Sequence, residues 1–301
     1  DEKDIIHANK KDVEIFANVY SDKLNAYLKE LSQDSELNKL RTSIREEAVA
    51  NIQQGLSKGK RVFELTSPTG SGKTLMMLAL ANEVLKKRIE QNQEPVRIIY
   101  ALPFLSITEQ VEAEVLKIFK GYEGYIQRID SKSQNKRFED IQEALDNDPD
   151  DSIIHELGML TFQENTFGYP FIITTFVRFF EAILSNHNAT LLKLPNFSKS
   201  IFLLDEIQSL PPRLYTFFVA YLTKFCEKFD SYAIISTATQ PNFNLPKKGS
   251  NVEDIAKFFS DYKNPYKLLE HEKYFSHKIF NRYQINFDKE PIDLDILRTK
   301  I

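Results

Sequence analysis

The segment from residue 67 to residue 74 has the residue types that hold a phosphate group. It reads Ser67, Pro68, Thr69, Gly70, Ser71, Gly72, Lys73, Thr74. Glycines let backbone N–H groups curl around an anion, and the start of a helix adds partial positive charge. In such a loop the lysine contacts the β and γ phosphates and the threonine hydroxyl joins a Mg²⁺ shell, so we expect ATP and Mg²⁺ here. Ser67 replaces the first glycine of the usual pattern, and a plain surface turn is the alternative.

An acidic pair has the groups that hydrolysis of a bound ATP needs. Asp205 and Glu206 directly follow the apolar stretch 200–204, and ligands of doubly wound sheets bind at the carboxyl ends of strands. We assign Asp205, with Thr74, to the metal, and Glu206 to orienting and deprotonating the attacking water. Gln208 is expected to sense the γ phosphate. The alternative for the pair is the ordinary acidic start of a helix.

Strands and helices alternate around these residues, which predicts an α/β fold with a parallel sheet flanked by helices. Strands are predicted at 61–66, 96–102, 171–174, 200–204 and 233–236, and the runs 98–100, 171–173 and 201–204 are continuously apolar, as expected in the middle of a sheet covered on both faces. Spacings of three to four residues predict helices at 73–91, 106–119, 177–185 and 213–229. The loop 67–74 therefore lies between a strand and a helix, as a phosphate-binding P-loop requires.

The expected domain organisation follows from where this alternation starts and fades. Residues 1–57 are expected as an N-terminal helical segment, because apolar residues recur at helical spacing from about residue 11 to residue 57. Residues 58–246 are expected as the nucleotide-binding domain, with a polar insertion off the core at about 121–169, where aspartates cluster around Pro149. Residues 247–301 are expected as a C-terminal extension or linker.

Composition excludes several classes of protein. With 39 Lys and Arg against 43 Asp and Glu, the net charge is −4, so any nucleic acid must meet a local patch rather than a uniformly basic surface. The single cysteine, Cys226, excludes a disulfide framework and a zinc site of paired cysteines. No apolar run reaches the length of about 18 residues that a membrane span needs, so we expect a cytoplasmic protein without a membrane partner.

Five spaced blocks resemble one family of motor enzymes. They are Leu37-Asn38-x-x-Arg41-x-x-Ile44-Arg45, Tyr100-Ala101-Leu102-Pro103-Phe104-x-Ser106-Ile107-x-Glu109-Gln110, Thr174-Thr175-Phe176 with Phe179-Phe180-Glu181, Asp205-Glu206-Ile207-Gln208-x-Leu210-Pro211-Pro212 and Ser236-Thr237-Ala238-Thr239-Gln240-Pro241. The P-loop, the acidic box and the last block, in this order, resemble superfamily two helicases. All five blocks together resemble the CRISPR-associated helicase-nuclease of type I systems. The resemblance spans Leu37 to Pro241 and implies a first RecA-like domain.

That family implies an enzyme recruited to a guide-RNA surveillance complex (Cascade). It moves along displaced single-stranded DNA by hydrolysing ATP, while an HD nuclease domain degrades the strand. The sequence has no His-Asp dipeptide and, after Pro241, no block like that of a second RecA-like domain. We therefore expect half a motor, either truncated or split from a partner chain. Hydrolysis should be weak in isolation, because a missing arginine finger removes a factor of about 10³ to 10⁵ in rate.

The resemblance also indicates where the DNA strand would bind. In this superfamily, loops after two of the motif strands contact the sugar-phosphate backbone, so the expected contacts are Pro103, Phe104, Ser106, Thr174 and Thr175. Hydroxyl and loop N–H groups hold phosphates without reading the sequence. For Phe104 and Phe176, core packing is the alternative to base stacking. Arg41 is a candidate for the adenine side, or else it pairs with a neighbouring glutamate.

Hydroxyl groups follow the last expected strand. Ser236, Thr237 and Thr239 are expected to couple hydrolysis to closure of the second domain, since hydroxyls at a strand end can exchange hydrogen-bond partners. The alternative is a turn that simply ends the strand.

Two other functions stay open on the sequence. One is an RNA helicase or remodeller of the same superfamily, which RNA-selective stimulation would distinguish. The other is a nucleotide-responsive docking module without turnover, which Glu206 argues against.

Overall fold

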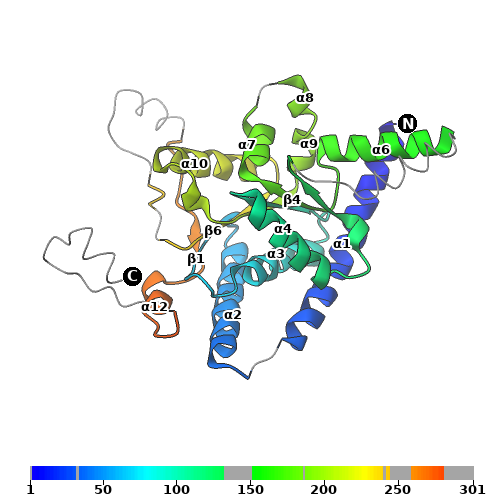
Figure 1. The fold of residues 1–301 in the computed structure, drawn as a ribbon. Helices are drawn as coiled ribbons and strands as arrows, with labels where there is room; N and C mark the ends of the chain where they lie inside the picture. Colours follow the sequence, from blue (N-terminus) through cyan, green and yellow to red (C-terminus); the bar gives the residue numbers. More distant parts are fainter. Residues whose placement is uncertain are drawn as a thin grey trace, which may run out of the picture.

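One parallel sheet organises the chain (Figure 1). The computed structural model describes residues 2–31, 34–131, 151–185, 187–239, 242–244 and 259–280. In these residues the strands run in the order β3-β4-β2-β5-β6-β1-β7, and every pair is parallel. The strands are β1 (Val62–Thr66), β2 (Arg97–Leu102), β3 (Ile126–Ile129), β4 (Phe171–Thr175), β5 (Ser200–Leu204), β6 (Tyr232–Thr237) and β7 (Tyr266–Lys267).

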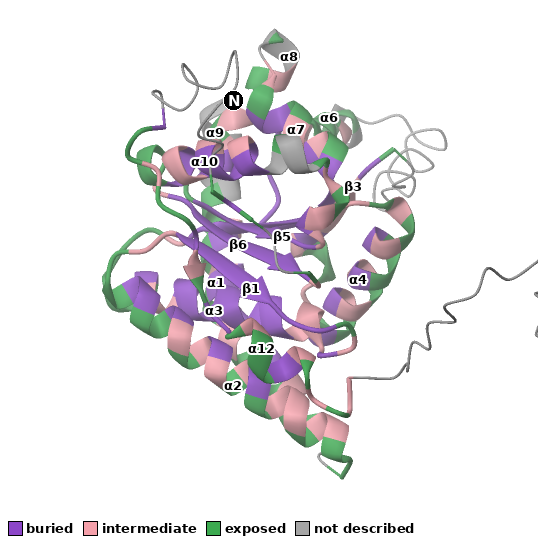
Figure 2. Ribbon diagram, turned by 90° about the vertical axis from the view of Figure 1, so that its left-hand side faces the viewer, coloured by how far each residue is buried: buried purple, intermediate pink, exposed green. Residues whose placement is uncertain are grey.

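Helices cover both faces of this sheet (Figure 2). They are α1 (Glu2–Glu30), α2 (Glu36–Ser57), α3 (Lys73–Glu90), α4 (Leu105–Ile118), α6 (Asp151–Thr166), α7 (Phe176–Leu184), α8 (Asn188–Leu191), α9 (Leu194–Phe197), α10 (Pro212–Lys228) and α12 (His271–Phe275), with short 3-10 turns η1 (Glu123–Tyr125) and η2 (Ile207–Ser209). Helices α1 to α4 pack on one face, and α7, α9 and α10 on the other. Every residue of β1, β2, β4, β5 and β6 is buried, as their apolar sequences predict. The predicted α/β fold, a parallel sheet flanked by helices with an N-terminal helical segment, is confirmed.

The two N-terminal helices belong to the core of this domain. In α1, Phe16, Tyr20 and Leu24 follow one another at four-residue spacing and are at most 2% exposed, because this spacing puts them on one helix face. The Tyr20 hydroxyl donates to the Leu78 carbonyl of α3 at 3.1 Å. Ser35 caps α2 by accepting a hydrogen bond from the Asn38 backbone N–H at 3.1 Å.

Helix α2 approaches the sheet closely through a glycine. A Cβ on Gly55 would lie 2.6 Å from Cε1 of Phe63 in β1 and 3.0 Å from the Tyr266 ring in β7. A larger residue would therefore push α2 away from the sheet. This matters for the site, because the start of α2 lines a pocket beside the P-loop.

Two segments that were expected to leave the core contribute strands to it. The prediction of a polar insertion at 121–169 is wrong for residues 126–129, which form edge strand β3 beside β4, and wrong for Phe167 and Tyr169, which are buried. The region expected as an extension after residue 247 contributes β7, which pairs with β1. The expected features at residues 240–241, 245–258 and 281–301 lie outside the described residues.

Cys226 is a buried free thiol, which agrees with its expected role as a small apolar residue. In the part of the chain that the structure describes, no helix combines the length and the apolar character needed to cross a bilayer.

Candidate nucleotide-binding and catalytic site

The P-loop connects β1 to α3 in an anion-binding geometry. Gly70 and Gly72 have φ angles of 85° and 82°, in the left-handed region that only glycine adopts without strain. Helix α3 starts after Gly72 with no side-chain cap and no acidic residue in its first turn, so its first N–H groups are free for an anion. Ser67, which replaces the usual glycine, is buried and accepts a hydrogen bond from Ser71 Oγ at 3.1 Å. The departure from the pattern thus closes the loop internally.

Asp205 stands at the carboxyl end of β5 and is 6% exposed. Its Oδ1 accepts the Glu206 backbone N–H at 3.0 Å, and its Oδ2 accepts the Tyr100 hydroxyl at 3.2 Å. Burial raises the pKa of Asp205, and the nearby Lys73 ammonium opposes this shift. A buried carboxylate with few donors around it is suited to a cation.

Glu206 connects the acidic pair to the P-loop. Its Oε1 lies 2.5 Å from Lys73 Nζ, and its Oε2 accepts the side-chain amide of Gln208. The residue has φ 58° and ψ 46°, a left-handed conformation that is uncommon outside glycine and is found at functional sites. The structure therefore brings together Lys73, Glu206 and Gln208, the three residues predicted to be catalytic, although 133 positions separate the first two.

The surroundings of Asp205 fit a metal ion. The Tyr100 hydroxyl donates to Asp205 Oδ2, and the Thr74 side chain is near enough to lower the pKa of Tyr100, so the two predicted metal ligands share one neighbour. Ser236 Oγ is buried near Asp205 and lowers its pKa, yet neither this atom nor Gln208 Oε1 has a hydrogen-bond partner of full geometry within the described residues. Unsatisfied buried oxygen atoms beside a carboxylate are what Mg²⁺ or its water shell would use.

The end of β6 lies between the P-loop strand and the acidic strand. Its Thr237 carbonyl accepts the Ser67 backbone N–H at 3.2 Å, which ties the two strand ends together. The Thr237 hydroxyl accepts the Thr239 backbone N–H at 3.1 Å. This is the strand-ending turn named above as the alternative, and the coupling role of Ser236, Thr237 and Thr239 stays a prediction.

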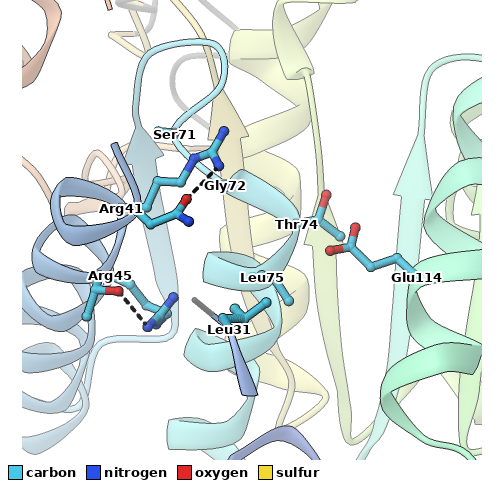
Figure 3. Close-up of a pocket in the computed structure, with 10 residues that line it drawn as sticks. Leu31, Arg41, Arg45, Ser71, Gly72, Thr74, Leu75 and Glu114 are labelled. Atoms are coloured by element: carbon cyan, nitrogen blue, oxygen red, sulfur yellow. Dashed lines mark hydrogen bonds between the residues drawn. The ribbon is translucent and has the colours of Figure 1, made fainter. Parts of the chain in front are cut away.

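A pocket of about 300 Å³ lies beside the P-loop (Figure 3). It is lined by Leu31, Asn38, Arg41, Thr42, Arg45, Ser71, Gly72, Thr74, Leu75 and Glu114. Arg41 donates from Nε to the Gly70 carbonyl at 2.8 Å and from a terminal nitrogen to Asn38 Oδ1 at 3.2 Å. The alternative of a pair with a neighbouring glutamate is thus wrong, and Arg41 holds the P-loop from outside. A polar pocket at this position suits the base and sugar of a nucleotide.

A larger cavity of about 690 Å³ lies elsewhere, at the amino-terminal ends of the strands. It is lined by Arg97, the first residue of β2, and by Lys199, which directly precedes β5. Ligands of parallel sheets bind at the carboxyl ends, so the smaller pocket is the better candidate for a nucleotide.

The predicted DNA contacts lie at the carboxyl ends of β2 and β4, but not all are accessible. The expected DNA contact at Thr174 is wrong, because its side chain is fully buried and its hydroxyl donates to the Ile129 carbonyl at 2.6 Å. Thr175 is 8% exposed and caps α7 by accepting the Arg178 N–H. Ser106 is exposed, and Pro103 is half-buried. Of the two alternatives for the phenylalanines, core packing is wrong for Phe104, which is 60% exposed, and correct for Phe176, which is 3% exposed.

Sequence reasoning missed the role of Tyr100 and of the pocket residues Arg45 and Glu114. A tyrosine inside an otherwise aliphatic strand was the available signal for Tyr100. The spacing of Asn38, Arg41 and Arg45 along one helix face was the signal for the pocket. Among the described residues, no group of three or more His, Cys, Asp or Glu forms a metal cluster, so a cation here would depend on few protein ligands and on the nucleotide.

The chain is similar to known proteins over most of its length. A family model described as "Type III restriction enzyme, res subunit" matches residues 39–241. A protein of Haloferax volcanii named CRISPR-associated nuclease/helicase Cas3 is 26% identical over 235 residues, which cover 73% of this chain and 24% of that protein. The chain thus spans about a quarter of that relative's length.

Two solved structures are also similar. A DUF1998 helicase MrfA bound to DNA and AMPPNP is 16% identical with a TM-score of 0.42, and the match covers 80% of this chain and 30% of that chain. A T. fusca Cas3 with AMPPNP is 15% identical with a TM-score of 0.43, covering 64% of this chain and 21% of that chain.

Proposed function

We propose that this chain, which belongs to the family described as type III restriction enzyme, res subunit, is an ATP-hydrolysing motor domain that acts on single-stranded DNA in type I CRISPR interference. The coarser description, a helicase-type domain of superfamily two related to Cas3, follows from the family match and the relative. The DNA strand, the CRISPR role and the turnover are the parts we propose.

The observation that carries the proposal is the contact between Lys73 and Glu206. A nucleotide-binding loop alone would explain the lysine, but not a carboxylate held in a left-handed conformation against it. Glu206 is 28% exposed at its side chain, so water can reach it, whereas Asp205 is buried. The two acids therefore have different environments, which suits one for a metal and the other for a proton.

Each residue then has a chemical task. Thr74 and Asp205 would hold Mg²⁺, which when bound neutralises phosphate charge in the transition state. Lys73 binds the β and γ phosphates after it leaves Glu206. Glu206 then orients the attacking water and accepts its proton, while Gln208 keeps the carboxylate in place through the second oxygen.

The partners are proposed from the relative. The Haloferax volcanii protein is named a nuclease as well as a helicase, and this chain covers about a quarter of it. We propose that an HD nuclease and a second RecA-like domain are joined to this domain, in the same chain or in another. A guide-RNA surveillance complex (Cascade) in the cytoplasm would then deliver the displaced DNA strand.

The test is ATP hydrolysis by this 301-residue chain, with and without single-stranded DNA. Lys73→Ala should reduce turnover to the blank. Lys86→Ala is a matched control, since Lys86 lies on the same helix and pairs with Glu83 instead; it should behave as the wild type. Turnover by Lys73→Ala at a wild-type rate that stands above the blank would refute the site.

The same assay separates the other functions. Stimulation by single-stranded RNA but not DNA would favour an RNA remodeller. Nucleotide binding with no turnover, even after the second RecA-like domain of a relative is added, would favour a docking module.

A further inference from the structure

Two apolar side chains are exposed at the carboxyl ends of neighbouring strands. Strands β2 and β4 pair with Leu102 opposite Thr175. Phe104 lies two residues after Leu102, and Val177 lies two residues after Thr175. Their side chains are 60% and 63% exposed. Phe176, next to Val177, is 3% exposed, so the core at this end of the sheet does accept aromatic rings. One exposed apolar residue is ordinary, but two at the same edge as the P-loop suggest a ligand.

The groups around them indicate what kind of ligand fits. The segments 103–106 and 174–177, where the strands pass into α4 and α7, contain no lysine or arginine, and the adjacent Arg178 lies 3.6 Å from Glu181. Phosphates on this edge would meet hydroxyl and backbone N–H groups, such as those of the exposed Ser106, rather than cations. Since such contacts are weaker than ion pairs, a polynucleotide bound here must gain part of its affinity from apolar contact.

We infer that Phe104 stacks on a base of the bound strand and that Val177 extends the apolar surface beside it. The inference rests on the proposed function, in which single-stranded DNA follows this edge. It adds a base contact to the expected backbone contacts. Stacking tolerates every sequence because all bases have a π face, so this grip remains compatible with a motor that moves along any strand.

The experiment compares two fluorescein-labelled oligonucleotides of equal length, one of deoxythymidine and one of abasic deoxyribose units, which carry the same phosphates. Binding to the 301-residue chain is measured by fluorescence anisotropy at several salt concentrations. Wild type should prefer the thymidine oligomer by about tenfold. Phe104→Ala should lose this preference and keep the salt dependence, which reports phosphate contacts. Phe104→Trp should retain the preference.

Phe162→Ala is the matched control. Phe162 is 37% exposed but lines the cavity at the opposite edge of the sheet, so its loss should change neither oligomer's affinity. Equal wild-type affinity for the two oligomers would overturn the stacking role while the proposed function stands; a protein partner for this surface would then be the better explanation. Equal losses on both oligomers in Phe104→Ala would also overturn it. Absence of any binding by the wild type would refute the DNA function itself.

Discussion

Glu206→Gln should bind ATP more tightly while it loses turnover. In this structure Lys73 Nζ is paired with Glu206 Oε1 at 2.5 Å, so ATP must displace a carboxylate before its phosphates reach the lysine. At this distance and an effective dielectric constant of about 20, the bare attraction is on the order of 7 kcal/mol. The cost of removing the two charges from water offsets most of this attraction, since the Lys73 and Glu206 side chains are only 10% and 28% exposed.

The net magnitude follows from what the substitution keeps. A hydrogen bond to a charged group contributes about 1.5–3 kcal/mol, and glutamine retains an oxygen that accepts from the ammonium but loses the charge. We take about half, or roughly 1 kcal/mol, as the energy that ATP no longer has to overcome, which is about fivefold in Kd. Loss of the base should reduce turnover by about 10²- to 10⁴-fold.

The assay is a titration with a fluorescent ATP analogue at fixed Mg²⁺, together with phosphate release. Removing any carboxylate near the phosphates lowers its repulsion of ATP. Glu114→Gln, which removes a carboxylate that lines the pocket, is therefore the control for charge alone. It should tighten binding less than Glu206→Gln and keep turnover. Unchanged or weaker ATP binding by Glu206→Gln would refute the reasoning that the ion pair competes with the nucleotide.

Two further predictions concern stability. Gly55→Ala should lower the free energy of unfolding by about 1–2 kcal/mol, because overpacking against the buried Phe63 ring, 2.6 Å from the new Cβ, outweighs a helix-propensity gain of about 1 kcal/mol. Gly158→Ala, in α6 with nothing within 4 Å, should instead be neutral or stabilising in the same urea melts; equal effects would contradict the packing argument. Asp205→Asn should stabilise the metal-free chain at pH 7. Because burial raises the pKa of Asp205 above its ordinary value of 3.8, the folded state holds this proton more tightly, and stability falls as pH rises from about 4 through the folded pKa. The difference in the free energy of unfolding between wild type and Asp205→Asn should disappear below about pH 4. A difference that does not change with pH would count against the burial effect.

The central strands and the P-loop could be predicted because their signals are local. Strands β1, β2, β4, β5 and β6 are buried on both faces, and this favours apolar runs, which are continuous at 98–100, 171–173 and 201–204. Strand β3 has the sequence Ile-Gln-Arg-Ile, and only its first residue is buried. Strand β7 has two residues. Both are edge strands that form by pairing with β4 and β1, so no local sequence pattern predicts them.

The site shows the same division between local and long-range information. The P-loop and the acidic pair each carry their own motif, and the rule that ligands bind at the carboxyl ends of strands was enough to bring them together. The sequence did not indicate that Tyr100 would donate a hydrogen bond to Asp205, because this depends on β2 lying next to β5. It also did not indicate that Lys73 would rest on Glu206, since a motif describes the nucleotide-bound arrangement.

Thr174 and Phe104 show why residue type alone misassigned the DNA edge. In a strand buried on both faces, alternation does not tell which hydroxyl is free, and Thr174 lies inside the β3–β4 pairing, where its hydroxyl donates a hydrogen bond to the Ile129 carbonyl. Phe104 lies beyond the last paired residue of β2, at the point where α4 begins, and its ring is left outside the core. Accessibility here depends on lying beyond the last paired residue and on the face of the following helix, since Phe176 and Phe179 are buried and Val177 is exposed. By that criterion the exposed surface after β2 and β4 is formed by Phe104, Ser106 and Val177, so contact with bases as well as phosphates is the property to measure there.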